Sequence, residues 1–215
     1  MIDYGEEKNR HYQVMREYLT YLNFNKDESV LKGGSALLMC YGLDRFSEDL
    51  DFDCASKRRM KESVVKFCND HNFEYRIAKD TDTVERYMIY YHGVEKPLKL
   101  EISHRRTNIP LSAITKINGI CVYTIDQMAI LKSSAYSNRD KIRDFYDMCF
   151  ICNNYFDSLS ENAKSTISVA FEYKGLEQYD YITREQSDDL IDEGKLLEDF
   201  LTACDKLGVM NDEET

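Results

Sequence analysis

Residues 32–53 read KGGSALLMCYGLDRFSEDLDFD, and this stretch is the most informative part of the chain. It begins with the small-residue turn Gly33-Gly34-Ser35, which offers a hydroxyl group and backbone N–H groups. Fourteen residues after the serine, Asp49-Leu50-Asp51 opens an alternating segment that is typical of a β-strand. Because residues i and i+2 of a strand point to the same face, the two aspartates project together, while Leu50 and Phe52 face the core.

Two adjacent carboxylates repel each other unless a cation or a proton lies between them. Carboxylate oxygens suit Mg²⁺, which usually takes one or two carboxylates together with substrate phosphates. The pair of aspartates therefore suggests metal-dependent chemistry on a nucleotide. Phosphoryl and nucleotidyl transfer commonly use two metal ions held by three acidic groups. Glu101 fits the third position, because it is the acidic member of the alternating segment Leu98–Ser103. Ser35, as the N-cap of a helix over 36–41, would hold phosphates at the helix N-terminus.

Other nucleotide and metal motifs fail. No lysine follows the glycines as a P-loop requires, and a GxGxxG fingerprint is absent. The Asp49-x-Asp51-x-Asp53 pattern imitates an EF-hand loop, but Cys54 and Met60 stand where glycine and glutamate are needed. No Ser-His-Asp or Cys-His arrangement stands out among the four histidines.

The composition is that of a globular protein of 215 residues, with 43% hydrophobic residues and a net charge of −11. An acidic chain does not attract nucleic acid by bulk charge, so RNA contact would need a local basic patch. The candidates are Lys57–Lys61, His104–Arg106 and Arg139–Arg143. Without a signal peptide or a long apolar segment, we expect a cytoplasmic protein with no membrane contact and seven reduced cysteines.

Strand-like segments dominate residues 1–123, whereas residues 124–215 are helical throughout. This order predicts an α+β fold, with a mixed β-sheet flanked by helices over 1–123 and a C-terminal helical domain over 124–215. Asn118-Gly119 predicts a hairpin turn. The expected strands are 49–53, 73–78, 83–91, 98–103, 114–117 and 120–123, and the expected helices are 6–23, 58–71, 125–136, 138–154, 158–173 and 184–206.

The segment Lys32–Phe52 closely resembles the AbiEii/AbiGii abortive-infection toxin family, part of the DNA polymerase β-like nucleotidyltransferase superfamily. A second block supports the resemblance: Lys132, then Arg139, then the run Arg143-Asp144-Phe145-Tyr146-Asp147. It looks like the family's later motif, a lysine followed by a helix with the pattern R-D-x-Y-D. The resemblance implies a nucleotidyltransferase-type sheet followed by helices.

The resemblance also implies roles for individual residues. It assigns the triphosphate to Lys32, Gly33, Gly34 and Ser35. Asp49, Asp51 and Glu101 would be catalytic and would bind Mg²⁺ or Mn²⁺. Lys132 would contact the phosphates or pair with a catalytic carboxylate, and Asp144 would lie near the nucleotide or orient Lys132.

The expected activity is Mg²⁺-dependent transfer of NMP from an NTP to an acceptor hydroxyl, by the toxin of a bacterial toxin–antitoxin pair. A tRNA, another RNA or a protein could be the acceptor, and a cognate antitoxin the partner. Two alternatives stay open: a nucleotidyltransferase that modifies small molecules of the aminoglycoside kind, and a nucleotide-binding partner protein without turnover.

Overall fold

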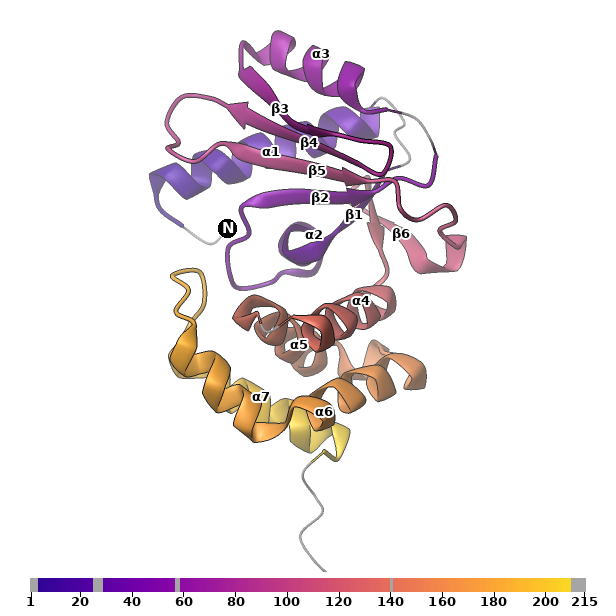
Figure 1. Cartoon of the computed structure of the whole chain (residues 1–215), viewed down its shortest axis with the longest axis vertical. Coiled ribbons are helices and arrows are strands. Elements are labelled where there is room, and N and C mark those ends of the chain that lie inside the picture. Colours follow the sequence, from indigo (N-terminus) through magenta and orange to yellow (C-terminus); the bar gives the residue numbers. More distant parts are fainter. Residues whose placement is uncertain (1–3, 25–28, 57–58, 140, 210–215) are drawn as a thin grey trace, which may run out of the picture. The chain divides into compact units, whose positions relative to one another are not determined.

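The computed structural model describes residues 4–24, 29–56, 59–139 and 141–209. The chain forms two compact units, residues 1–123 and residues 124–215 (Figure 1). The first unit contains every strand of the described chain, and the second is helical, so the predicted α+β class is confirmed. Within the described ranges, no helix combines the length and apolar character needed to cross a membrane.

A seven-stranded mixed sheet forms the centre of the first unit. Its strand order is β3-β4-β5-β2-β1-β7-β6. β2 runs parallel to β5 and antiparallel to β1, and β1 runs parallel to β7. The strands are β1 (Val30–Lys32), β2 (Asp49–Asp53), β3 (Glu74–Asp80), β4 (Val84–Tyr90), β5 (Leu98–Ser103), β6 (Ile114–Ile117) and β7 (Ile120–Tyr123).

Helices α1 (Glu6–Phe24) and α3 (Lys61–His71) cover one face of this sheet. Tyr18 of α1 meets the rings of Phe52 on β2 and Phe67 on α3, with ring centroids 6.5 and 5.0 Å away. The apolar side chains of β2 therefore face these helices, and the carboxylates of Asp49 and Asp51 lie on the other face. Helix α2 (Gly33–Tyr41) ends at Gly42, whose φ of 73° is left-handed.

The β6–β7 hairpin turns at the predicted dipeptide. Asn118 and Gly119 have φ values of 51° and 83°. Positive φ at both central residues is the requirement of a type I′ turn, whose twist matches that of the paired strands. Here the turn residues alone identified the structure.

The second unit comprises α4 (Ile125–Asn138), α5 (Ile142–Tyr155), α6 (Glu161–Glu185) and α7 (Glu193–Leu207). Phe145, Phe171 and Phe200 meet in its core, with ring centroids 4.8 to 5.8 Å apart. Cys149 and Cys152 are buried free thiols in α5, as expected for core packing.

The predicted boundaries of the last two helices were wrong. Instead of helices over 158–173 and 184–206, α6 continues to Glu185 and α7 begins at Glu193. Asp192 caps α7, because its carboxylate accepts hydrogen bonds from the backbone N–H groups of Gly194 and Lys195. The helical spacing of apolar residues continues across the break and so conceals this cap.

Candidate active site

Strand β2 presents two carboxylates on one face of the sheet. Leu50 and Phe52 are fully buried on the other face, while Asp49 and Asp51 keep partial exposure. Buried apolar residues and partly exposed aspartates therefore alternate along β2, as the sequence predicts. Asp49 and Asp51 lie two residues apart on the same side.

The neighbouring strand β5 adds a third carboxylate. In the parallel register of β2 and β5, Asp51 is paired with Glu101 and Asp49 with Lys99. All four side chains therefore lie on one face of the sheet. Three carboxylates and one ammonium group form a compact charged patch there.

Protein cations already neutralise two of these carboxylates. Lys99 Nζ lies 2.5 Å from Asp49 Oδ2. Arg86 on β4 contacts Glu101 Oε2 through Nη2 at 2.6 Å and through Nε at 2.8 Å. Among the described residues, no three Asp, Glu, His or Cys side chains are arranged to hold a metal ion. The structure thus brings the three predicted carboxylates onto adjacent strands. Asp49 contacts Lys99, and Glu101 contacts Arg86.

The electrostatics of this patch shift two pKa values. Burial raises the pKa of Asp51; Lys99 opposes the shift, and the charges of Asp49 and Glu101 add to it. Burial lowers the pKa of Lys99, but the hydrogen bond to Asp49 and the three nearby carboxylates outweigh it, so the net shift is upward. The patch thus favours a cation close to its carboxylates.

The Gly-Gly-Ser turn forms the first turn of α2 rather than a cap before it. The helix begins at Gly33, and Lys32, not Ser35, is its N-cap. The predicted capping role of Ser35 was wrong, because its hydroxyl lies within the helix and donates to the carbonyl of Asp49. Ser35 Oγ also lies 3.0 Å from Ser47 Oγ. Ser35 therefore ties α2 to the start of β2.

Close approach explains the two glycines. Gly33 has a φ of 76°, and a Cβ there would lie 3.4 Å from Asp51 Oδ2. A Cβ on Gly34 would lie 2.8 Å from both Arg45 Nη2 and Ser47 Oγ. The turn thus runs against the carboxylate strand with no room for a side chain at Gly34. The N–H groups of a first helical turn have no partner within the helix and favour anionic ligands.

Lys32 is bound within the protein. Its Nζ lies 2.5 Å from Asp53 Oδ1, and Tyr123 donates to Asp53 Oδ2 at 2.8 Å. Arg106 Nε lies 3.2 Å from the same oxygen. The sequence analysis did not predict that Asp53 is a buried acceptor that contacts Lys32. The alternation of β2 predicts only that the Asp53 side chain lies on the same face as Asp49 and Asp51.

The second unit contains the other predicted residues. Lys132 of α4 is buried, with Nζ 3.2 Å from Asp144 Oδ1 and 2.5 Å from Asp147 Oδ2 on α5. Arg139 Nε donates to Asp144 Oδ2 at 2.7 Å. Asp144 and Asp147 therefore both contact the ammonium group of Lys132. Arg143 pairs with Asp188 instead of these aspartates.

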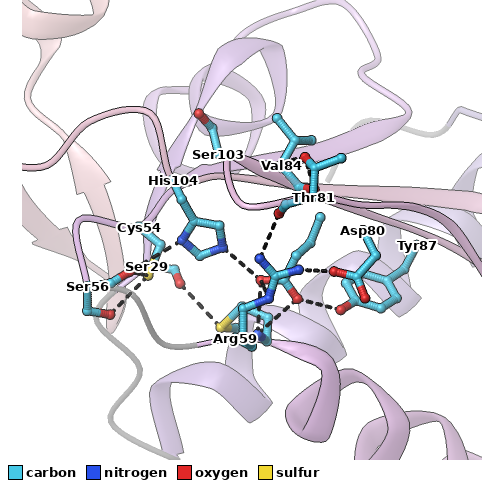
Figure 2. A network of polar contacts seen from close by, with 12 residues as sticks. Ser29, Cys54, Ser56, Arg59, Asp80, Thr81, Val84, Tyr87, Ser103 and His104 are labelled. Atoms are coloured by element: carbon cyan, nitrogen blue, oxygen red, sulfur yellow. Dashed lines mark hydrogen bonds and ion pairs between the residues drawn. The ribbon is translucent and has the colours of Figure 1, made fainter.

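Most described members of the basic clusters are paired internally. Arg59, His104 and Tyr87 all reach the buried carboxylate of Glu85, with His104 Nε2 2.7 Å from Oε1 (Figure 2). Arg59 also contacts Asp80 (Figure 2). Lys57 and Arg58 lie outside the described residues. These clusters mainly hold strands and loops together, which leaves a smaller basic surface than the sequence suggested.

A mixed sheet that carries aspartates on one strand and a glutamate on its parallel neighbour, next to a Gly-Gly-Ser helix start, is typical of nucleotidyltransferases. The sequence profile described as "Nucleotidyl transferase AbiEii toxin, Type IV TA system" matches residues 17–211. The chain belongs to this family and is a nucleotidyltransferase of the toxin type.

Solved structures share the fold of this chain. JHP933 from Helicobacter pylori shares 29% identity over 95% of this chain and 93% of its own, with a TM-score of 0.76. MenT4, a nucleotidyltransferase toxin from Mycobacterium tuberculosis H37Rv, shares 15% identity over 93% of this chain and 83% of its own, with a TM-score of 0.55. The second likeness shows the fold alone. A search of curated proteins finds no match.

Proposed function

We propose that the protein transfers NMP from an NTP to an acceptor hydroxyl in a Mg²⁺-dependent reaction. The acceptor oxygen forms a bond to the α-phosphorus, the bond from that phosphorus to the β-phosphate breaks, and pyrophosphate and the hydroxyl proton leave. The observation that carries the proposal is the register that pairs Asp51 with Glu101 and places Asp49 on the same face.

The proposed ligands have the chemistry that a divalent cation requires, although their side chains are not arranged around a metal ion in this structure. Asp49, Asp51 and Glu101 supply only carboxylate oxygens, which Mg²⁺ and Mn²⁺ prefer. Lys99 and Arg86, seated on two of them, show that positive charge is stabilised there. When bound, the metal would neutralise charge on the phosphates and lower the pKa of the attacking hydroxyl.

The phosphates would be held by the protein itself. The N–H groups of Gly33, Gly34 and Ser35 would bind phosphate oxygens at the start of α2, and Lys32 would add positive charge. We assign Lys132 a phosphate contact, with Asp144 and Asp147 fixing the direction of its ammonium group. Lysine acts on phosphate as a compact point charge.

The distribution of charge along the chain is relevant to the identity of the acceptor. Residues 124–215 carry 20 of the 39 acidic residues but only nine of the 28 lysines and arginines, so this half holds the whole net charge of −11. The first half is neutral. An RNA acceptor, our first candidate, would therefore bind through local basic side chains such as the exposed Arg105. The acidic helical half favours a second candidate, a cationic small molecule of the aminoglycoside kind, and would equally suit a basic antitoxin.

The test is pyrophosphate release with each of the four NTPs, Mg²⁺ and total bacterial RNA, with α-labelled products resolved on a gel. We expect one labelled RNA band and its loss in Asp51→Asn and Asp49→Asn. Lys66→Gln, an exposed change on α3, is the matched control. Turnover that survives both aspartate substitutions would refute the site, and label on a small molecule would select the second candidate.

A further inference from the structure

Lys99 is in direct contact with Asp49, a carboxylate of the proposed metal site. Its register places it directly opposite Asp49, and its Nζ lies 2.5 Å from Oδ2. The ammonium is about as close to this oxygen as a protein cation can be. A metal ion bound through this oxygen would compete with the Lys99 ammonium group.

The surroundings hold Lys99 in place. Its side chain is 30% exposed, and Asp51 and Glu101 lie on the same face within electrostatic reach. Across the sheet the paired positions run Lys32, Asp51, Glu101 and Arg86, so basic groups stand at both ends of the acidic pair. Lys32 and Arg86 have other direct partners, Asp53 and Glu101. Lys99 is therefore the cation in direct contact with an aspartate of the proposed metal pair.

We propose that Lys99 is a positioning residue that acts as a built-in counter-cation: it holds Asp49 in the metal-free protein and yields it when a nucleotide–metal complex arrives. This inference rests on the proposed function. Displaced from Asp49, the Lys99 ammonium needs a new anion, and the triphosphate brings several negative charges to the same patch. The divalent cation and the nucleotide therefore bind cooperatively, and the metal alone binds weakly.

Mn²⁺ binding measured by electron paramagnetic resonance tests this proposal without any turnover. We expect Lys99→Gln to bind Mn²⁺ alone about tenfold more tightly than the unaltered protein, because one competing charge is gone. A non-hydrolysable NTP analogue should tighten Mn²⁺ binding in the unaltered protein and do so less in Lys99→Gln. Lys99→Arg keeps the charge and should restore weak binding of the metal alone.

Two controls separate a local effect from a general one. Lys66→Gln removes the same charge from the exposed surface of α3 and should leave Mn²⁺ affinity unchanged. Asp51→Asn should abolish Mn²⁺ binding both in the unaltered protein and in Lys99→Gln. Thermal unfolding of each variant verifies that it folds.

Equal or weaker Mn²⁺ binding by Lys99→Gln, with binding still lost in Asp51→Asn, would overturn the role of Lys99 and leave the metal site intact. If Asp51→Asn leaves Mn²⁺ binding unchanged, or if no variant binds Mn²⁺, both the metal assignment and this inference would be overturned.

Discussion

At the scale of single residues, the site depends on how closely two segments approach. Gly34 allows the first turn of α2 to lie against Arg45 and Ser47, and Ser35 then bonds to the carbonyl of Asp49. A backbone contact of this kind leaves no space for even one methyl group. Gly34 therefore serves the packing of the turn, in addition to the phosphate binding proposed for it.

Gly34→Ala should destabilise the protein by about 1–3 kcal/mol, because its Cβ would lie 2.8 Å from two side-chain atoms in a packed region. Urea unfolding measures the change. Gly194→Ala is the control: its Cβ would meet Asp192 Oδ1 at an ordinary 3.4 Å, so it should be neutral or slightly stabilising. Equal stability of the two variants would contradict the close approach.

Lys132→Met should cost about 3–5 kcal/mol of unfolding free energy, because it leaves Asp144 and Asp147 buried without their shared ammonium partner. Chemical denaturation provides the measurement. Lys164→Met, which removes a surface pair with Glu161, should cost under about 1 kcal/mol. A loss below about 1 kcal/mol in Lys132→Met would show that the two aspartates do not depend on this lysine.

At the scale of elements, α1 is tied to the strand that carries the carboxylates. His11 of α1 is buried, and its Nε2 lies 2.7 Å from the carbonyl oxygen of Glu48, the residue before β2. Since a carbonyl only accepts, Nε2 carries the hydrogen, and Nδ1 accepts from Tyr91 Oη at 2.7 Å. This arrangement suits the neutral imidazole.

Stability should consequently fall in mild acid. Burial lowers the pKa of His11 below its usual 6.5, although Glu48, Asp49 and Glu7 act in the opposite direction. Below pH 6.5, His11 becomes protonated in the unfolded state but stays neutral in the folded state. The free energy of unfolding therefore drops by up to about 1.4 kcal/mol per pH unit, until the pH reaches the pKa of His11 in the folded state. Denaturation between pH 5 and 7.5 should show a steeper slope for the unaltered protein than for His11→Gln. Identical slopes would contradict this assignment.

Most elements could be predicted because their signals are local. The alternation of Asp49–Asp53 and the dipeptide Asn118-Gly119 each fix a backbone conformation by themselves. The ion pair of Lys99 with Asp49 could not be predicted, since it depends on the parallel register of two strands far apart in sequence. The capping role assigned to Ser35 was wrong for a different, local reason: a serine after two glycines fits both a cap and a first helical turn.

At the scale of the whole molecule, the two units carry different parts of the proposed chemistry. Residues 1–123 hold the glycine turn and the carboxylates and are neutral overall. Residues 124–215 hold the Lys132 cluster and the entire negative charge. The helical unit thus carries a net charge of −11, and such an acidic unit suits basic partners.

In the proposed reaction the α-phosphate of an NTP, and not its γ-phosphate, reaches the acceptor. Parallel reactions with α-labelled and γ-labelled NTP, Mg²⁺ and total bacterial RNA decide this most directly. We expect α-label to move onto the acceptor, γ-label to leave as pyrophosphate, and both changes to vanish in Asp51→Asn. Transfer of γ-label to the acceptor, or unchanged turnover in Asp51→Asn, would contradict it.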